Sequence, residues 1–506
     1  MEKHERLDYS SEQESPQENL RITQDTDQAY EFLIKTHVSS ETASHVNLDV
    51  LRRKIDWHIV PIMFCCYFIQ FLDKVSLNYS AVMGLNKDLN LTGNDFTNVG
   101  TAFFVAYVIA EIPNAFLLNK LPVAKWLGAN VLLWGITVAC TAATKDYSTL
   151  LAARIFLGIF EASIAPSLTI VSSQWYTKSE QAPRFSFWYT GVGIAQILGG
   201  LISFAFQHVS NPSFSGWKAM FVTLGCVTVA IGLGTILILP DSPIDARFLS
   251  ETEKTALLHH VAVNQTGIVN RRFKIKHTLE VLLDPQIWLL ILLMILPSSS
   301  SGIVTNYSAT VIRNFGYTPP IAALLNMPSG VVSIASTLVA GFGIRRTSNR
   351  WAWLVAICVP GIIGGALMSF MPETNHAGLL AGVYLVNAVI ASSPIVYQWA
   401  ASNVAGQTKR TTSFALLSIG FGIGSIIGPQ TFQAKDAPQY IPAKITVLAT
   451  QAATALMSVV LFSYYLLVNW HRNRSGRTPQ SVDDMSDAEK WRNLTDKENP
   501  DFRYVF

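Results

Sequence analysis

The chain has 506 residues, of which 50% are hydrophobic and only 14% are charged. Soluble domains average about 25% charged residues, so the composition argues against an ordinary soluble enzyme and favours a protein that crosses a lipid bilayer. The net charge of +3 is too small to indicate a nucleic acid as a partner.

The beginning of the chain differs in composition from the rest. Residues 1–50 are rich in Glu, Gln, Ser and Asp and show no periodic apolar face. Such a segment cannot bury enough apolar surface to offset its loss of conformational entropy, so we predict a disordered cytoplasmic tail. It lacks the features of a cleavable signal peptide, and we therefore expect the first apolar span to direct membrane insertion.

Twelve apolar stretches follow, each close to the ~20 residues that cross the hydrocarbon core of a bilayer. The first six lie at about 57–80, 97–118, 126–143, 149–171, 185–206 and 217–239. The other six lie at about 286–311, 321–343, 352–371, 377–399, 412–433 and 443–468. The pattern predicts an all-α membrane protein with twelve transmembrane helices in two six-helix bundles. We place the bundles at 51–240 and 286–468, joined by a cytoplasmic loop at 241–285 and followed by a cytoplasmic tail at 469–506.

Basic residues are unevenly distributed over the loops between these stretches. Cytoplasmic loops carry an excess of Lys and Arg, so the basic loops mark the inner side. With the N-terminus inside, the short inward loops contain Lys120, Lys125, Lys178, Arg184, Arg345, Arg346, Arg350, Lys409 and Arg410. Both termini are therefore predicted to be cytoplasmic, and the polar end of the chain to be mobile. One glycan acceptor, Asn90 of Asn90-Leu91-Thr92, falls in an outer loop.

Four charged residues lie within stretches that we expect to span the membrane. Asp73 and Lys74 belong to the first span, and Arg154 and Glu161 to the fourth. A charge in hydrocarbon costs roughly 3 kcal/mol on insertion scales, so such residues face a partner or a watery cavity. Arg154 and Glu161 share one helix face, roughly 10 Å apart along the axis. Neighbouring positions point about 100° apart, so Asp73 and Lys74 need separate partners, for which the residues of the fourth span are the candidates.

Two interpretations fit these charges. In the first, they form a structural network of salt bridges that locks helices together. In the second, Lys74 and Arg154 bind a carboxylate of the substrate while Asp73 or Glu161 takes a coupling proton. The planar guanidinium of Arg suits the second interpretation because it meets a carboxylate with two hydrogen bonds. Anion binding would also remove the cation that stabilises a buried carboxylate, which favours uptake of a proton.

Polar residues in other spans extend the candidate site. On the second span, we predict that Glu111 couples protons, with gating or a helix contact as the alternative. Tyr107 is predicted to donate a hydrogen bond to the substrate, with ordinary interior packing as the alternative. The spans of the second half nearly lack charges, so its candidates are the polar residues Asn306, Tyr307, Gln398 and Asn403. The first half would then handle charge and the second half substrate shape, although a single polar residue in a span is more often an interhelical hydrogen bond.

Other kinds of chemistry have no support in the sequence. The glycine-rich runs at 191–200 and 420–428 follow no strand and precede no Gly-Lys-Ser/Thr, so nucleotide binding is not predicted. Small residues in membrane helices instead allow close packing. We find no metal-ligand cluster or hydrolase triad, and therefore expect no metal, no cofactor and no enzymatic activity. Two aromatic clusters are predicted mostly to mark helix ends at the membrane interface, namely Trp175 with Tyr176, and Phe185, Phe187, Trp188 and Tyr189.

Several motifs together resemble those of one known group. They are Phe71-Leu72-Asp73-Lys74-Val75-Ser76-Leu77-Asn78-Tyr79, Glu111-Ile112-Pro113-Asn114, Trp134-Gly135, Arg154-Ile155-Phe156-Leu157-Gly158-Ile159-Phe160-Glu161-Ala162, Trp175-Tyr176-Thr177-Lys178-Ser179-Glu180-Gln181, Asn326-Met327-Pro328-Ser329-Gly330 and Ser402-Asn403-Val404-Ala405-Gly406-Gln407-Thr408-Lys409-Arg410. From about residue 56 to residue 470, the chain resembles the anion:cation symporter branch of the major facilitator superfamily, and within it the fungal allantoate permease group.

This resemblance implies roles for individual residues. In the wider branch, the basic residues at the positions of Lys74 and Arg154 engage the anionic substrate. Carboxylates at the positions of Asp73 and Glu161 take part in proton coupling, and a tyrosine at the position of Tyr107 lines the site.

The function that we expect is therefore transport. The chain would be a proton-driven symporter that imports a small organic anion, such as a carboxylate or a vitamin-like acid, across the plasma membrane by alternating access. Its partners would be this anion, protons and the lipid bilayer, and we expect a monomer. Two alternatives remain open, namely an efflux carrier for a secondary metabolite and a nutrient sensor that transports nothing.

Overall fold

The structure is a computed structural model that describes residues 28–36, 45–92, 95–207, 215–264, 273–317, 321, 324–372, 374–431, 441–474 and 494–506. Regular structure in these residues is helical. Twelve helical segments are long and apolar enough to cross a membrane, which confirms the predicted all-α fold with twelve spans.

The first half of the chain contributes six spans. They are α4 (Leu48–Val82), α6 (Asp95–Lys120), α7 (Val123–Thr141), α8 (Tyr147–Glu161) with α9 (Ile164–Trp175), α10 (Lys178–Tyr189) with α11 (Gly191–Gln207), and α12 (Gly216–Ile238). The short helix α5 (Leu85–Asp88) lies between α4 and α6. Helix α4 begins before the predicted apolar stretch because Asn47 caps it, accepting hydrogen bonds from the backbone N–H groups of Asp49 and Val50.

The second half contributes the other six spans. They are α15 (Pro285–Asn314), α17 (Met327–Thr347), α18 (Arg350–Phe370), α19 (His376–Val386) with the 3₁₀ segment η1 (Asn387–Ala391) and α20 (Ser392–Asn403), α21 (Gln407–Gln430), and α22 (Ile441–Arg474). Between the halves lie two further helices, α13 (Glu251–Ala262) and α14 (Ile275–Leu282).

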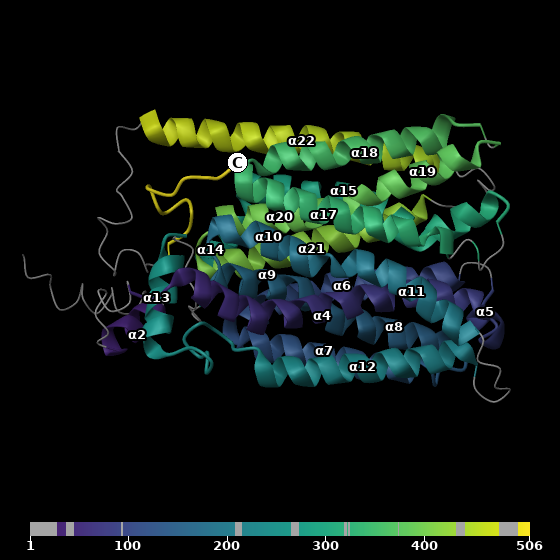
Figure 1. Ribbon diagram of the computed structural model, residues 1–506, viewed down its shortest axis with the longest axis horizontal. Coiled ribbons are helices and arrows are strands. Elements are labelled where there is room, and N and C mark those ends of the chain that lie inside the picture. The colour runs from purple at the N-terminus through teal and green to yellow at the C-terminus, as the bar shows by residue number, and fades with distance from the viewer. Residues whose placement is uncertain are drawn as a thin grey trace, which may run out of the picture.

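The two halves lie side by side with their spans running in one common direction (Figure 1). Helices α13 and α14 gather at one end of the molecule, which we call the linker end, and α5 lies at the opposite end. Helix α2 (Gln28–Thr36) also lies at the linker end, where Lys254 Nζ of α13 is 5.8 Å from the centroid of the Phe32 ring. Part of the predicted disordered tail is thus a helix, whereas residues 1–27 and 37–44 lie outside the described residues.

Glycines allow the closest helix approaches, within a half and between the halves. A Cβ atom on Gly135 of α7 would lie 2.7 Å from the backbone nitrogen of Val229 on α12. A Cβ atom on Gly193 of α11 would lie 2.5 Å from the carbonyl oxygen of Gly330 on α17, which belongs to the other half. Real Cβ atoms do not approach backbone so closely, so both crossings require glycine.

Three of the spans are interrupted near their middle. The fourth span breaks after Glu161, where α8 ends, and the fifth breaks at Thr190, between α10 and α11. The tenth span changes to a 3₁₀ segment at Asn387–Ala391. Interrupted helices leave backbone groups without their usual partners, so they occur in membranes where the backbone faces protein or a cavity. The break after Glu161 places this carboxylate at the carbonyl end of α8.

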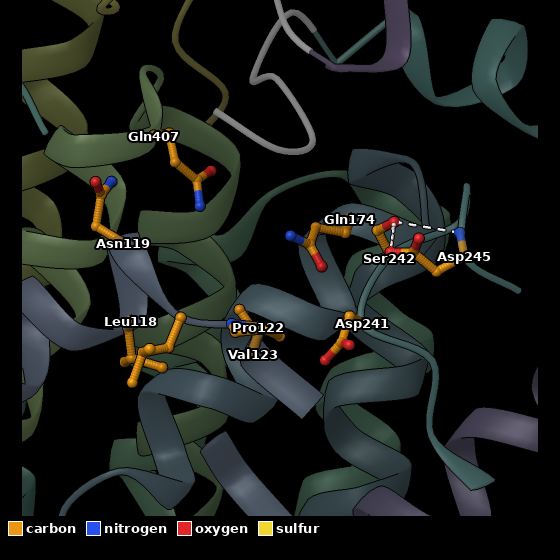
Figure 2. Close-up of a pocket in the computed structure, with 10 residues that line it drawn as sticks. Leu118, Asn119, Pro122, Val123, Gln174, Asp241, Ser242, Asp245 and Gln407 are labelled. Carbon is orange, nitrogen blue, oxygen red and sulfur yellow. Dashed lines mark hydrogen bonds between the residues drawn. The ribbon is translucent and has the colours of Figure 1, made fainter. Parts of the chain in front are cut away.

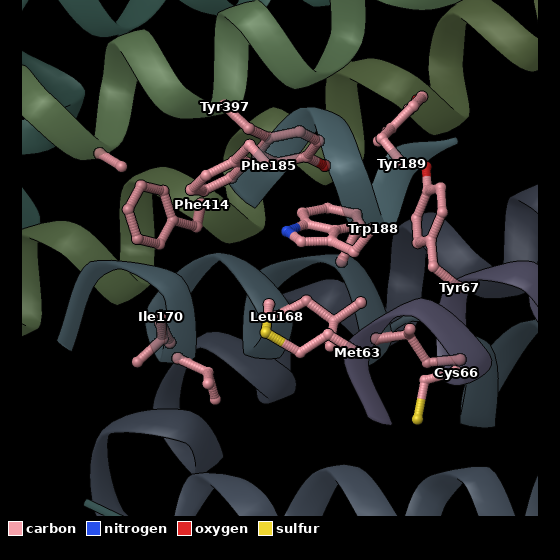
Figure 3. Close-up of a cluster of buried hydrophobic side chains, with 14 of the residues drawn as sticks. Met63, Cys66, Tyr67, Leu168, Ile170, Phe185, Trp188, Tyr189, Tyr397 and Phe414 are labelled. Atoms are coloured by element: carbon pink, nitrogen blue, oxygen red, sulfur yellow. The ribbon is translucent and has the colours of Figure 1, made fainter. Parts of the chain in front are cut away.

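A buried aromatic layer joins the halves (Figure 3). Trp188 of α10 is fully buried, and its ring meets the edge of Tyr67 at 4.8 Å between centroids. Tyr397 of α20 and Phe414 of α21 complete the layer from the second half. Trp188 therefore packs in the interior rather than at a membrane interface, contrary to the prediction, because α10 turns its aromatic face toward the other half.

The end of the chain is ordered where it is described. Residues 494–506, which we call the strap, run along the linker end without regular structure. Within the strap, Asp496 is fully buried, and Phe502 and Tyr504 are 1% and 4% exposed. We expected the polar end of the chain to be mobile. The strap instead packs against the second half, because its aromatic and acidic side chains find partners there.

Candidate functional site

An ion pair in the membrane interior joins the first and fourth spans. Lys74 Nζ of α4 lies 2.6 Å from Glu161 Oε1 of α8, and Gln70 Nε2 donates to the same oxygen at 2.9 Å. Glu161 is fully buried, and its other oxygen, Oε2, has no hydrogen-bond partner among the described residues. The lysine ammonium also compensates the partial negative charge at the carbonyl end of α8. Two of the four predicted charges therefore meet.

The other two charges, those of Asp73 and Arg154, attract each other, but both side chains keep atoms without hydrogen-bond partners among the described residues. Asp73 is 2% exposed and Arg154 is 3% exposed. Asp73 Oδ2 accepts a hydrogen bond from Trp134 Nε1 at 3.4 Å, whereas Oδ1 has no partner in the part of the chain that the structure describes. The guanidinium carbon of Arg154 lies 5.7 Å from the ring centroid of Phe221.

Arg154 leaves one complete edge of its guanidinium without acceptors. Neither Nε nor Nη2 has a hydrogen-bond partner among the described residues. Arg184 shows what this edge does elsewhere in the same chain, because its Nε and Nη2 hold the two oxygens of Asp56 at 3.1 and 2.7 Å. Leaving a buried donor unsatisfied costs about 1–3 kcal/mol, and more for a charged group. The free edge of Arg154 therefore matches a carboxylate in both geometry and charge.

An aromatic ring from each half lies beside this charged group. Lys74 Nζ lies 5.1 Å from the ring centroid of Phe421 on α21, so its charge interacts with the face of an aromatic ring. The Tyr107 ring of α6 lies 6.4 Å from the same Phe421 ring. Lys74, with 15% of its side chain exposed, is more accessible than Glu161. The predicted site residues Lys74 and Tyr107 thus both meet α21 through Phe421, at the contact between the halves.

Glu111 lies on α6, one turn from Tyr107, and is fully buried. Its Oε2 accepts a hydrogen bond from Asn114 Nδ2 at 3.3 Å, and Asn114 Oδ1 in turn accepts one from Trp126 Nε1 at 2.9 Å. Its Oε1 has no hydrogen-bond partner, and no cation pairs with it among the described residues. Glu111 is therefore not part of the Lys74–Glu161 pair.

Of the four polar candidates of the second half, the two whose side chains are described, Gln398 and Asn403, do not join the charged group. Gln398 accepts a hydrogen bond from Arg350 Nε at 2.5 Å and donates to the carbonyl oxygen of Lys178 at 3.3 Å, at the linker end. Asn403 exchanges two hydrogen bonds with the backbone of Val505 in the strap, at 2.8 and 2.9 Å. Asn306 and Tyr307 belong to α15, but their side chains lie outside the described residues.

Sequence reasoning missed several neighbours of the charged residues. Gln70, Trp134, Phe221 and Phe421 all contact one of them, as the distances above show. Only Gln70 carried a signal that could have been used, because it is a polar residue one helical turn before Lys74 on the same face. The three aromatic residues come from other spans, and the sequence does not specify how those spans are rotated.

A pocket lies at the linker end and not at the charged residues (Figure 2). Its lining joins the loop between α6 and α7, the end of α9, the segment that follows α12, and the start of α21. The polar residues around it are Asn119, Gln174, Asp241, Ser242, Asp245 and Gln407. Asp241 is held in place by Lys125, whose Nζ lies 3.2 Å from the carboxylate. The halves meet beside this pocket, where Asn119 Nδ2 donates to Thr408 Oγ1 at 3.4 Å.

The predicted glycan acceptor lies at the opposite end. Asn90 is exposed just after α5 and adopts a positive φ of 52°. Exposure at a turn is compatible with modification, which stays a prediction.

Comparisons with known proteins agree with this architecture. The sequence profile of the Major Facilitator Superfamily matches residues 63–429. The chain is 36% identical over 466 residues to the thiamine pathway transporter THI73 of Saccharomyces cerevisiae, covering 92% of this chain and 87% of that protein. It is 30% identical over 471 residues to the allantoate permease of the same yeast, covering 90% and 86%. The solved structure of the proton:xylose symporter XylE shares the fold with a TM-score of 0.65 at 14% identity, covering 81% of this chain and 95% of that chain.

Proposed function

Because the chain belongs to the Major Facilitator Superfamily, we propose that it is a proton-coupled symporter that imports a small organic anion by alternating access. The chain is a multi-pass membrane transporter and not an enzyme. The proposal concerns the charge of the substrate, the coupling ion and the direction of transport.

The edge of Arg154 that carries Nε and Nη2 supports an anionic substrate. It is a buried pair of charged donors with no acceptor among the described residues, and Arg184 uses the same pair to bind a carboxylate. A carboxylate substrate would satisfy both donors at once, and Lys74 would supply a second positive charge. Allantoate, named in one relative, is itself a carboxylate anion, which agrees with this assignment.

The Lys74–Glu161 pair supports coupling to protons. While the pair is intact at 2.6 Å, the ammonium compensates the Glu161 carboxylate. A substrate anion that attracts Lys74 would leave Glu161 buried with an uncompensated charge, and a proton would neutralise it. Anion and proton would then enter together. Asp73 is the alternative proton carrier, because it also has an unpartnered oxygen in the described structure, and Glu111 is a third candidate.

The linker end is proposed to face the cytoplasm. Several basic residues lie there. Lys125 contacts the segment after α12, and Lys409 contacts α14. Lys178 and Arg350 both contact the strap. An excess of Lys and Arg in short loops marks the cytoplasmic side of a membrane protein. Relatives among fungal permeases make the plasma membrane the proposed location.

Uptake measurements test this proposal. Yeast cells that lack their own permeases would express the chain and receive labelled allantoate, a panel of other small carboxylates, and a neutral methyl ester of each. We expect uptake of at least one acid, no uptake of its ester, and loss of accumulation when a protonophore collapses the proton gradient. Accumulation that persists with the protonophore would contradict proton coupling, equal uptake of the ester would contradict the anion site, and net extrusion would contradict import.

A further inference from the structure

The strap, which begins 20 residues after the end of α22, lies at the linker end. The strap is the yellow segment that ends at the label C in Figure 1. Residues 475–493, which precede it, lie outside the described residues. The burial of Asp496, Phe502 and Tyr504 shows that the strap is bound in one position rather than lying loosely on the surface.

The strap is anchored to the second half by buried polar contacts. Asp496 Oδ1 lies 2.7 Å from Lys409 Nζ of α21, and Tyr504 donates its hydroxyl proton to Asp496 Oδ2 at 2.6 Å. The backbone of Val505 pairs with the side chain of Asn403 in both directions, and its carbonyl oxygen also accepts from Trp399 Nε1 at 3.0 Å. These contacts fix the strap to α20 and α21, so it moves with the second half.

Arg350 connects the strap to the first half. Its backbone N–H donates to the carbonyl oxygen of Phe506 at 2.8 Å, and its Nη1 donates to the same oxygen at 3.4 Å. Its Nη2 donates to the carbonyl oxygen of Lys178, on α10, at 3.4 Å. Arg350 is 3% exposed, and its other side-chain hydrogen bonds go to oxygens of Gln398, Ser348 and Ser402.

Lys178 provides a second connection between the halves. Its Nζ lies 4.3 Å from the ring centroid of Phe502 in the strap. A cation above an aromatic face is attracted by the ring, most strongly where water is excluded. Arg350 and Arg410 both repel the charge of Lys178, while Asp496 attracts it. Phe502 therefore stabilises a cation whose near neighbours include two other cations.

We propose that the strap is a latch that holds the linker end of the transporter closed. Opening this end requires α10 to move away from α18 and α20, which breaks the contacts of the Lys178 carbonyl with Arg350 and Gln398. While the strap is docked, the same movement also separates Lys178 from Phe502. The docked strap therefore favours the closed end, and Phe502 and Arg350 are its positioning residues. The inference does not depend on the identity of the substrate or on proton coupling.

Thiol labelling of a gate residue tests the latch without any substrate. Ser402 is fully buried on α20 and bonds with Gln398 and Arg350, the two residues that contact the Lys178 carbonyl, so opening of this end should raise the reactivity of Ser402→Cys. The five native cysteines would be replaced first. In the purified full chain, we expect Phe502→Ala to raise the labelling rate of Ser402→Cys about tenfold, which corresponds to loss of one desolvated cation–π contact. Arg503→Ala is the matched control. Among the described residues, Arg503 bonds to the side chain of Asn473 on α22 and to the carbonyl oxygens of Pro500 and Phe502 within the strap, so the labelling rate is expected to stay the same.

A double-mutant cycle separates a latch from a folding defect. Lys178→Gln removes the cation and leaves the strap intact, so it should raise the labelling rate as Phe502→Ala does, and the two changes together should add little. Lys178→Arg, unlike Lys178→Gln, should leave the labelling rate low, because Arg also binds aromatic faces. Labelling that falls with Lys178→Gln would mean that repulsion from Arg350 and Arg410 dominates, and the latch would be refuted. Additive effects of the two changes, or no effect of either, would refute it equally.

Discussion

Four charged side chains are buried in the interior, and they differ in how completely ion pairs and hydrogen bonds satisfy them. Lys74 and Glu161 form a close pair with Gln70, whereas Arg154 keeps two donors without acceptors in the described structure. A network built only to lock helices would satisfy all its donors, since each unsatisfied group in the interior costs free energy. The unequal matching therefore favours the functional interpretation over the purely structural one.

Neutralising Glu161 should separate transport from its driving force. Glu161→Gln keeps the size of the side chain and its bond with Gln70, but the amide cannot release a proton. We expect proton-driven accumulation of the anion to be lost, by tenfold or more, while exchange of labelled for unlabelled anion across the membrane persists. Both are measured by uptake into preloaded vesicles. Accumulation that equals that of the unmodified chain would move the coupling role to Asp73.

The elements show how far the sequence determines the structure. The apolar stretches specified all twelve spans, because length and hydropathy suffice for this prediction. The breaks after Glu161 and at Thr190 were not predicted, although Gly191 follows the second one, because the sequence analysis took the glycines of this span as positions of close packing. The strap was missed for a different reason. Its polar composition indicates mobility, and its partners on α20, α21 and α22 are distant in sequence.

At the linker end, one lysine compensates several carboxylates. Lys409 is fully buried, and its Nζ lies 2.8 Å from Glu280, 2.8 Å from Asp284 and 2.7 Å from Asp496. Lys409→Met would remove this cation from all three acids and, among the described residues, leave Asp284 only its ion pair with Lys497 at 3.3 Å. Removing one partner of a buried pair costs about 3–5 kcal/mol. We expect a large fall in the thermal unfolding midpoint of the purified protein.

The exposed pair beside it provides the control. The side chain of Lys276 is 81% exposed and lies 3.0 Å from Glu498, so Lys276→Met should change stability by less than about 1 kcal/mol. Equal loss of stability in both variants would show that Lys409 has no special role.

On the scale of the whole molecule, the proposed orientation in the membrane rests on the distribution of charge. The basic residues gather at the linker end, while Asn90 is exposed at the opposite end. The sequence predicted both features, because loop charge and span count together specify an orientation. It did not predict how the halves contact each other through Gly193, Trp188 and Phe421, since such contacts depend on the rotation of each span.

Glycosylation can test this orientation. If the linker end faces the cytoplasm, Asn90 is presented to the side where glycans are added. We expect an endoglycosidase to increase the gel mobility of the chain from yeast membranes, and Asn90→Gln to abolish that change. The variant Asn264→Gln is the matched control, because Asn264 lies at the linker end and should carry no glycan. A glycan at Asn264 would reverse the orientation.

The proposed transport depends on the guanidinium edge of Arg154, and the variant Arg154→Lys tests it most directly. Lysine retains the positive charge but cannot present two parallel donors, so substrate uptake at equal surface delivery should fall at least tenfold. The measurement is the initial rate of uptake of the transported acid as a function of its concentration, with the amount of protein at the cell surface measured in parallel. The account predicts a sharp loss of kcat/KM with unchanged delivery. Uptake by Arg154→Lys that matches the unmodified chain would contradict it.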